Sequence, residues 1–363
     1  MYTDRALPVY SIFVRPYNLE ALGEDIWQED LVPAKLEIKE KPYIIGFVYR
    51  GSHIRKFPKK SYYCKFLQPN RFLGAKEIHL NAEYMDLSLI RNKLSLDFFS
   101  EIGTLAPQSR HVLLDINNEF QGVYLHLESV DEQFLKRRGL PYGAIYYAED
   151  DDANFSLMSS LDHDIKAAYE SGYYRKCGDK NDDKTLRQFI YKINTTPRRD
   201  FEAEIHMYVD VEKYLRWLAG VVCTQNFDGF IHNYALYFNP KSRLFEPIPW
   251  DYDATWGRDI HGRDLEYDYI PIQGYNTLTA RILDVQTFRH RYQQIMEDIL
   301  ENHLTVSNLQ PKIESMHRLI RAHVVNDPYK KEDIDRFDQE SQVIVQYIRD
   351  RGRFLRNHLS DLN

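Results

Sequence analysis

The sequence predicts an α+β fold with a β-rich N-terminal half and a helical C-terminal half. Short runs rich in β-branched and aromatic residues, bounded by Gly, Pro or Asn, recur up to about residue 148. Segments with the apolar spacing of amphipathic helices dominate from about residue 184 onward. We therefore expect one two-lobed domain, with a β-rich N-lobe over 1–128 and a mainly helical C-lobe over 129–363. A cleft between two such lobes is a common place for a ligand.

Five strands and one helix are predicted in the first hundred residues. Asp86 can cap the first turn of a helix over 86–102, and Gly103 lies just past its end. The five strand runs span 7–14, 34–39, 43–51, 60–68 and 78–84.

Two further strands, "RHVLLDIN" and "GVYLHLE", are joined by the turn "NNEFQG". A short helix follows, with Ser129 as its N-cap and Gly139 as its stop. "YGAIYYA" predicts one more strand, and the acidic segment over 148–183 reads as a solvated loop with some helix. The strongest helical patterns span 209–226, 287–304, 306–324 and 339–359.

Charge and cysteine content exclude several classes of protein. The formal net charge is −7, whereas nucleic-acid-binding proteins normally carry a basic excess. The three cysteines are far apart and form no CxxC pair, which argues against a disulfide framework or a structural zinc site. No apolar run approaches the roughly 18–20 residues of a membrane span. We expect a chain that folds in a reducing cytoplasm and binds neither nucleic acid nor membrane; its oligomeric state is left open.

An acid and an amide stand five residues apart in "TQNFDGFIHNYALYF", between a predicted buried helix and a predicted strand. These are Asp228 and Asn233. The following segment, "YALYFNPKSRLFEPIPWDYD", predicts a hairpin that turns at 239–242 and brings 231–234 beside 247–250. Asp251 then lies at the open end of the hairpin, near Asn233 and Asp228. Three oxygen-bearing side chains at one point suit a hard cation such as Mg²⁺.

Protein kinases use the same order of groups. A catalytic-loop Asp accepts the proton of the substrate hydroxyl, and an Asn five residues later and an Asp after a hairpin hold Mg²⁺ on the ATP phosphates. Asp228 fits the base, and Asn233 and Asp251 fit the metal ligands, for Mg²⁺ or alternatively Mn²⁺. His232, beside Asn233, is interpreted as a hydrogen-bonded loop histidine. An Asp-Gly pair is also a common turn, so the spacing alone leaves a purely structural reading open.

The pattern departs from that of ordinary kinases. "NFD" stands in place of His-Arg-Asp, "DYD" in place of Asp-Phe-Gly, and neither G-x-G-x-x-G nor a Walker motif is present. These departures exclude an ordinary kinase, so among kinases only an atypical one remains.

The segment "YRGSHIRKFPKKSYYCKF", residues 49–66, resembles the signature of the CotH family of spore-coat kinases. "NEFQGVYLHLESVDEQFLKRRG" and "PIPWDYDATWG" are also similar to the family, and the resemblance extends from about residue 8 to beyond 350. It implies an atypical kinase that uses ATP and a divalent metal. Its expected substrates are serines of serine-rich spore coat proteins and of the kinase itself. The resemblance also implies synthesis in the mother-cell cytoplasm and residence in the spore coat.

Within that resemblance, the basic loop between two predicted strands becomes the phosphate side of the site. Lys65 is our candidate for the lysine that grips the ATP phosphates, and Arg55 for a bidentate phosphate contact. From charge alone, a solvated hairpin tip is the better explanation of the loop, and it is the resemblance to the family that favours the phosphate role for Arg55 and Lys65. Tyr146 and Trp250 are the candidate aromatic wall for adenine, with core packing as the alternative.

Two other functions fit parts of the sequence. A non-enzymatic coat scaffold or pseudokinase would keep the fold and tolerate loss of Asp228. A hydrolase could use Asp228 and Asp251 as paired carboxylates, as glycosidases do, but it would leave the basic loop without a role.

Overall fold

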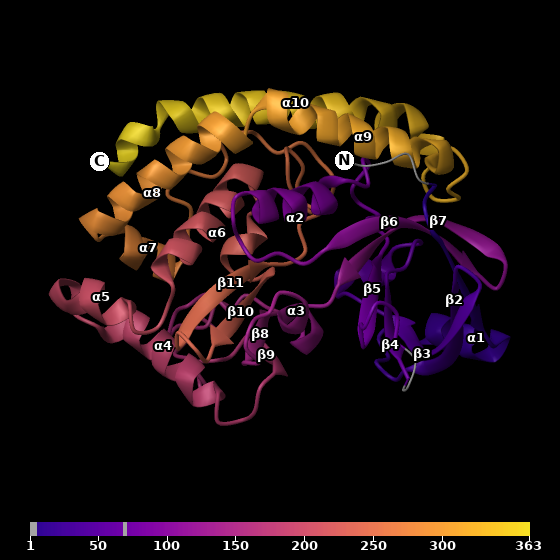
Figure 1. Ribbon diagram of the computed structural model, residues 1–363, viewed down its shortest axis with the longest axis horizontal. Helices are drawn as coiled ribbons and strands as arrows, with labels where there is room; N and C mark the ends of the chain where they lie inside the picture. The colour runs from indigo at the N-terminus through magenta and orange to yellow at the C-terminus, as the bar shows by residue number, and fades with distance from the viewer. Residues whose placement is uncertain (1–5, 68–70) are drawn as a thin grey trace.

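A closed barrel of seven strands forms the first part of the chain (Figure 1). The computed structural model describes residues 6–67 and 71–363; the last residue of the predicted run 60–68 lies outside this range. The strand order is β1-β2-β3-β4-β5-β7-β6, and parallel pairing of β1 with β6 closes the barrel. The strands are β1 (Val9–Val14), β2 (Val32–Ile38), β3 (Lys41–Tyr49), β4 (Tyr62–Phe66), β5 (Glu77–Asn81), β6 (Ser109–Ile116) and β7 (Glu119–Glu128).

Alternation along each strand fills the barrel with apolar side chains. On β4, Tyr62, Cys64 and Phe66 are buried inside, whereas Lys65 is exposed. Helix α1 (Pro16–Glu24) contributes Leu22 to the same core. All seven strands were predicted, but their closure into a barrel was not, because strand pairing is set by contacts far apart in sequence.

Helix α2 (Arg91–Glu101) begins five residues later than predicted. Asp86 does not cap it. Its carboxylate instead accepts hydrogen bonds from the backbone N–H groups of Ser88 and Arg91, so the chain forms a turn before the helix starts. Gly103, at φ +84°, follows the end of the helix as expected.

The short helix α3 (Glu132–Arg137) is capped by Asp131, which accepts from the backbone of Gln133 and Phe134. Ser129, the predicted cap, instead donates its hydroxyl to Glu77 at 2.6 Å.

A second, four-stranded sheet has the order β11-β10-β8-β9. The strands of this sheet are β8 (Ile145–Ala148), β9 (Tyr173–Cys177), β10 (Tyr234–Asn239) and β11 (Leu244–Pro249). Strand β9 lies in the segment that was predicted to be a solvated loop. The prediction missed this strand because its residues are half-buried at best and it forms the edge of the sheet.

Helices make up most of the chain after residue 183. Helix α6 (Val211–Thr224) is buried along most of its length and packs against α2, α8 and β11. Helices α9 and α10 arch over the molecule and reach the barrel (Figure 1). In the described chain, no helix is both long and apolar enough to cross a membrane. The other α-helices of this part are α4 (Asp183–Thr195), α5 (Arg198–Ile205), α7 (Thr277–Leu283), α8 (Gln286–Asp298), α9 (Val306–Val324) and α10 (Ile334–Asn357).

Candidate active site

A cavity of about 810 Å³ lies where the barrel meets the second sheet. Its walls come from the β3–β4 connection, the segment after β5, and the chain on either side of the β10–β11 hairpin. Five of the seven site residues predicted from sequence line it: Arg55, Asp228, Asn233, Trp250 and Asp251.

Asp228 is presented by a short loop after the buried helix α6. Gln225 ends the helix in the left-handed conformation, at φ +59°. Asn226 is buried, and its side chain accepts from the Gly229 N–H at 3.1 Å and donates to the Asp251 carbonyl at 3.4 Å. One amide thus ties the Asp228 loop to the segment that carries Asp251.

The hairpin places Asn233 and Asp251 at its open end. Tyr234 pairs with Pro249, and the Trp250 N–H donates to the Asn233 carbonyl at 3.1 Å, which is the predicted register. Asn233 and Asp251 both have left-handed backbones, with φ of +57° and +60°. Non-glycine residues adopt this region at a cost of order 1–3 kcal/mol, and such residues cluster at functional sites.

His232 bridges two acids of the cavity wall. Its Nδ1 lies 3.0 Å from Asp151 Oδ1, and its Nε2 lies 3.7 Å from Asp228 Oδ2. Burial acts to lower the pKa of His232, but Asp228 and Asp151 outweigh it and raise the pKa above its usual value. The predicted hydrogen-bonded loop histidine is confirmed, and it holds the Asp228 side of the loop in place.

Two further acids, the buried Glu83 and the half-buried Asp253, interact electrostatically with Asp251, and neither was predicted from the sequence as a site residue. Burial and the neighbouring carboxylates raise the pKa of Asp253 to about 8 and that of Glu83 well above its usual value. Glu83 Oε1 accepts from Asn92 at 3.1 Å, while its buried Oε2 has no partner in the described chain. Glu83 lies before α2 and more than one hundred and sixty positions from Asp251 in the sequence. No local motif therefore predicts that it reaches the site.

Asp251, Glu83 and Asp253 form a site that suits a divalent cation. A cation would neutralise the crowded carboxylates and could interact with the buried Glu83 oxygen that has no partner in the described chain. Among the described residues, no three His, Cys, Asp or Glu side chains form a ready-made metal cage. Mg²⁺ typically binds one or two protein carboxylates and completes its shell with water and substrate phosphates. Asn233 and Asp251 match that sparse set.

Arg50 supplies a positive charge on the cavity wall beside these acids. Its guanidinium donates to Asn81 Oδ1 and lies 5.7 Å from the centre of the Trp250 ring. Burial lowers its pKa, while Asp251 is the foremost of the nearby groups that oppose this. Arg50 belongs to the "YRGS" part of the signature and directly follows an apolar strand. This position in the motif was the sequence feature that could have identified it as a site residue.

The basic loop is engaged with the rest of the protein. Arg55 lines the cavity, but its Nε donates to the Gly51 carbonyl at 2.6 Å, and one terminal nitrogen lies 3.3 Å from the carbonyls of Ile26 and Gln28. Lys59 also lines the cavity, yet its buried ammonium pairs with Asp327 at 2.9 Å.

The structure does not bring Lys65 to the cavity. It lies exposed on the outer face of β4, four residues beyond Ser61, which lines the cavity. Four residues of strand span roughly 13 Å, so Lys65 shares a face with Ser61 but lies too far along it. Lys65 was predicted to bind the ATP phosphates, but it does not line the cavity and cannot bind a ligand there from this position.

Tyr146 also lies away from the cavity, and its neighbour Tyr147 lines it instead. Successive strand residues point to opposite faces, so Tyr146 enters the core and its hydroxyl donates to Asp183 at 3.2 Å. Tyr147 meets Trp250 edge to face, with ring centres 4.9 Å apart. The aromatic wall is therefore Trp250 with Tyr147.

Comparison with known proteins places the chain in a family. The family described as CotH kinase protein matches residues 47–355, and the chain belongs to it. It is 55% identical to the inner spore coat protein H of Bacillus subtilis (strain 168) over 362 residues, which covers 100% of both chains. It is 28% identical to an inner spore coat protein H-like protein of the same organism over 290 residues, 80% of this chain and 83% of the relative.

Two solved structures share weaker likeness. The HipA–HipB–operator DNA toxin–antitoxin complex of Shewanella oneidensis MR-1 aligns with a TM-score of 0.41 and 11% identity, covering 100% of this chain and 75% of the other. The Helicobacter pylori proinflammatory kinase CtkA aligns with a TM-score of 0.31 and 10% identity, covering 90% and 93%. Both scores are too low to carry an argument.

Proposed function

We propose that this protein is an atypical, two-lobed protein kinase that transfers the γ-phosphoryl group of ATP to serines of spore coat proteins and of itself. The lobes would be residues 1–128 and 129–363, with the 810 Å³ cavity between them. The observation that carries the proposal is the meeting of Asp228, Asn233 and Asp251 in one cavity, in the order and spacing that kinases use.

In the proposed reaction, Asp228 accepts the proton of the serine hydroxyl as the serine oxygen bonds to the γ-phosphorus. The bond between the γ-phosphorus and the bridging oxygen breaks, and ADP leaves with the electron pair. His232 positions this acid from one side, and Asn226 fixes its loop. Asn233 and Asp251 would hold a divalent cation, Mg²⁺ or Mn²⁺, which when bound neutralises phosphate charge.

Arg50 takes the phosphate-binding role first assigned to Lys65. Arg50 interacts electrostatically with Asp251, Glu83 and Asp253. Its positive charge therefore lies near the acids that would face the nucleotide. A guanidinium suits phosphate oxygens, since it offers paired donors in a plane. Arg55 would act indirectly, by holding the loop in place.

The coat location and substrates are proposed from the relative. The protein that is 55% identical over the full chain is an inner spore coat protein. We infer synthesis in the mother-cell cytoplasm followed by residence in the coat, where serine-rich coat proteins would be the substrates.

A thermal-shift titration followed by a transfer assay tests the function. ATP with Mg²⁺ should raise the melting temperature, and ATP with a serine-rich peptide should give phosphoserine and ADP in equal amounts. Stabilisation without transfer would favour the pseudokinase or scaffold, and a chain that binds no nucleotide would refute the kinase.

A further inference from the structure

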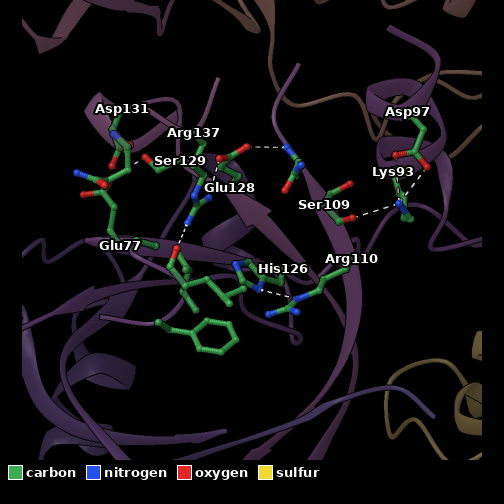
Figure 2. Close-up of a pocket in the computed structure, with 16 residues that line it drawn as sticks. Glu77, Lys93, Asp97, Ser109, Arg110, His126, Glu128, Ser129, Asp131 and Arg137 are labelled. Atoms are coloured by element: carbon green, nitrogen blue, oxygen red, sulfur yellow. Dashed lines mark hydrogen bonds and ion pairs between the residues drawn. The ribbon is translucent and has the colours of Figure 1, made fainter. Parts of the chain in front are cut away.

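A second cavity, of about 270 Å³, opens at one end of the barrel (Figure 2). It is bounded by β5, β6, β7, α2, α3 and the β4–β5 connection, and it shares no lining residue with the candidate active site. Barrel mouths are common ligand sites in proteins. The residues that matter here are Phe72, Ile78, Ser109, Arg110, His126 and Glu128.

The acids of this cavity are already engaged with partners. Glu128 pairs with Arg137 at 2.7 Å and with Arg138 at 2.9 Å, and it accepts from the Gln108 N–H. The other three acids are also occupied: Glu77 pairs with Lys176, Asp97 with Lys93, and Asp131 caps α3.

Arg110 is different, because within the described chain its guanidinium has no carboxylate partner. Its Nε donates to His126 Nδ1 at 3.3 Å, and one terminal nitrogen donates to the Tyr10 hydroxyl. The other terminal nitrogen, Nη1, makes no hydrogen bond to a described residue. The guanidinium also lies 5.1 Å from the centre of the Phe72 ring. A positive charge with only neutral partners therefore faces the cavity.

His126 adds a second donor beside it (Figure 2). Since arginine can only donate, His126 Nδ1 must be the acceptor, and it also lies 2.8 Å from the Tyr10 hydroxyl. The ring proton is then on Nε2, which has no partner in the described part of the chain. Burial, with Arg110 and Arg137 nearby, lowers the pKa of His126 to about 3, so the ring stays neutral at physiological pH.

We propose that this barrel-mouth cavity binds a small carboxylate with a short apolar or aromatic body. The carboxylate would accept from Arg110 Nη1 and His126 Nε2, and its body would pack against Phe72 and Ile78. Each of these two nitrogens can donate to one carboxylate oxygen, and the hydrogen bond from the guanidinium is charge-assisted. The volume corresponds to roughly nine water molecules at about 30 Å³ each. This site lies outside the proposed kinase chemistry and does not depend on it.

Calorimetric titration of the full-length protein with benzoate, and with benzamide as its uncharged counterpart, tests the proposal. Benzoate should bind saturably and benzamide should not. Arg110→Gln should weaken benzoate binding at least about tenfold, since a hydrogen bond to a charged group is lost. Lys241→Gln removes an exposed charge in the turn between β10 and β11, away from this cavity, and should leave the affinity unchanged.

Nitrogen NMR of the histidine rings gives a readout that needs no folded Arg110 variant. Benzoate should shift Nε2 of His126 in the wild-type protein, with the signal assigned by its loss in His126→Gln. The proposal is overturned if neither benzoate nor acetate binds, if ATP with Mg²⁺ displaces benzoate, or if Arg110→Gln folds and keeps full affinity. Tighter binding of inorganic phosphate than of benzoate would overturn the assignment to carboxylates.

Discussion

At the scale of single residues, the site combines groups that sequence spacing reveals with groups that it hides. Asp228 and Asn233 are separated by five positions and Asp251 follows a recognisable hairpin, so all three could be predicted. Arg50 and Glu83 lie just after β3 and β5, and they reach the cavity only because the barrel brings the ends of these strands there. Tyr146 lies one residue from Tyr147, which lines the cavity, so the predicted face of the strand was wrong. Lys65 lies four residues from Ser61, which lines the cavity, because strand alternation predicts the face of a residue but not its distance along the strand from the cavity.

Asp228→Asn should abolish most phosphoryl transfer while leaving ATP binding nearly intact. The amide cannot accept the serine proton, and a general base of this kind contributes about 10²- to 10⁴-fold to the rate. Initial rates of phosphoserine formation, with the ATP dissociation constant measured on the same preparation, check this. Near-normal turnover in the purified variant would rule out Asp228 as the base.

Arg50→Gln should weaken the binding of ATP with Mg²⁺ by about tenfold or more, because a charge-assisted contact to phosphate contributes roughly 1.5–3 kcal/mol. Lys65→Gln is the matched control, since it removes a charge that lies exposed on β4 outside the cavity. Calorimetric titration with ATP distinguishes them. A larger loss in the Lys65 variant than in the Arg50 variant would restore the original assignment.

At the scale of elements, most strands and helices could be predicted, and their ends and partners could not. The strand runs and the helical segments after residue 184 match periodicities of two and 3.6 residues. Strand β9 was missed because an edge strand with half-buried residues carries little apolar pattern. The start of α2 was misplaced because the Asp86 carboxylate bonds to the turn before it. Barrel closure depends on pairing of β1 with β6, about one hundred residues apart.

The joint between α6 and the β10–β11 hairpin depends on Asn226. Asn226→Ala should lower the free energy of unfolding by about 1–3 kcal/mol, since the buried Gly229 N–H loses its acceptor. Activity should fall with it, because the Asp228 loop loses its tie to the Asp251 carbonyl. Asn302→Ala, at an exposed helical position, is the control and should change stability by less than about 0.5 kcal/mol. Urea denaturation measures both, and equal effects would contradict the role of Asn226.

At the scale of the whole molecule, buried ion pairs connect the C-terminal helices to the segments around the site. Arg91 of α2 pairs with Glu340 of α10 at 2.6 Å and donates to the Thr255 carbonyl, four residues after Asp251. Lys59, on the cavity wall, pairs with Asp327, which follows α9 and also accepts from the Val123 N–H of the barrel. The sequence gives no sign of either pair, since their members lie more than two hundred residues apart.

The Lys59–Asp327 pair provides the last prediction. Both side chains are fully buried, so Asp327→Leu alone leaves the Lys59 ammonium without its counter-charge and should reduce the free energy of unfolding by about 3–5 kcal/mol. Adding Lys59→Met removes the stranded charge and should recover much of that loss, because replacing a whole buried pair by apolar groups is often close to neutral. Urea denaturation of the two single variants and the double variant measures the coupling. If the losses in free energy of unfolding of the two single variants simply add in the double variant, the ion pair does not connect the barrel to the C-terminal helices. The contact of α9 and α10 with the cavity wall would then be stabilised by packing alone.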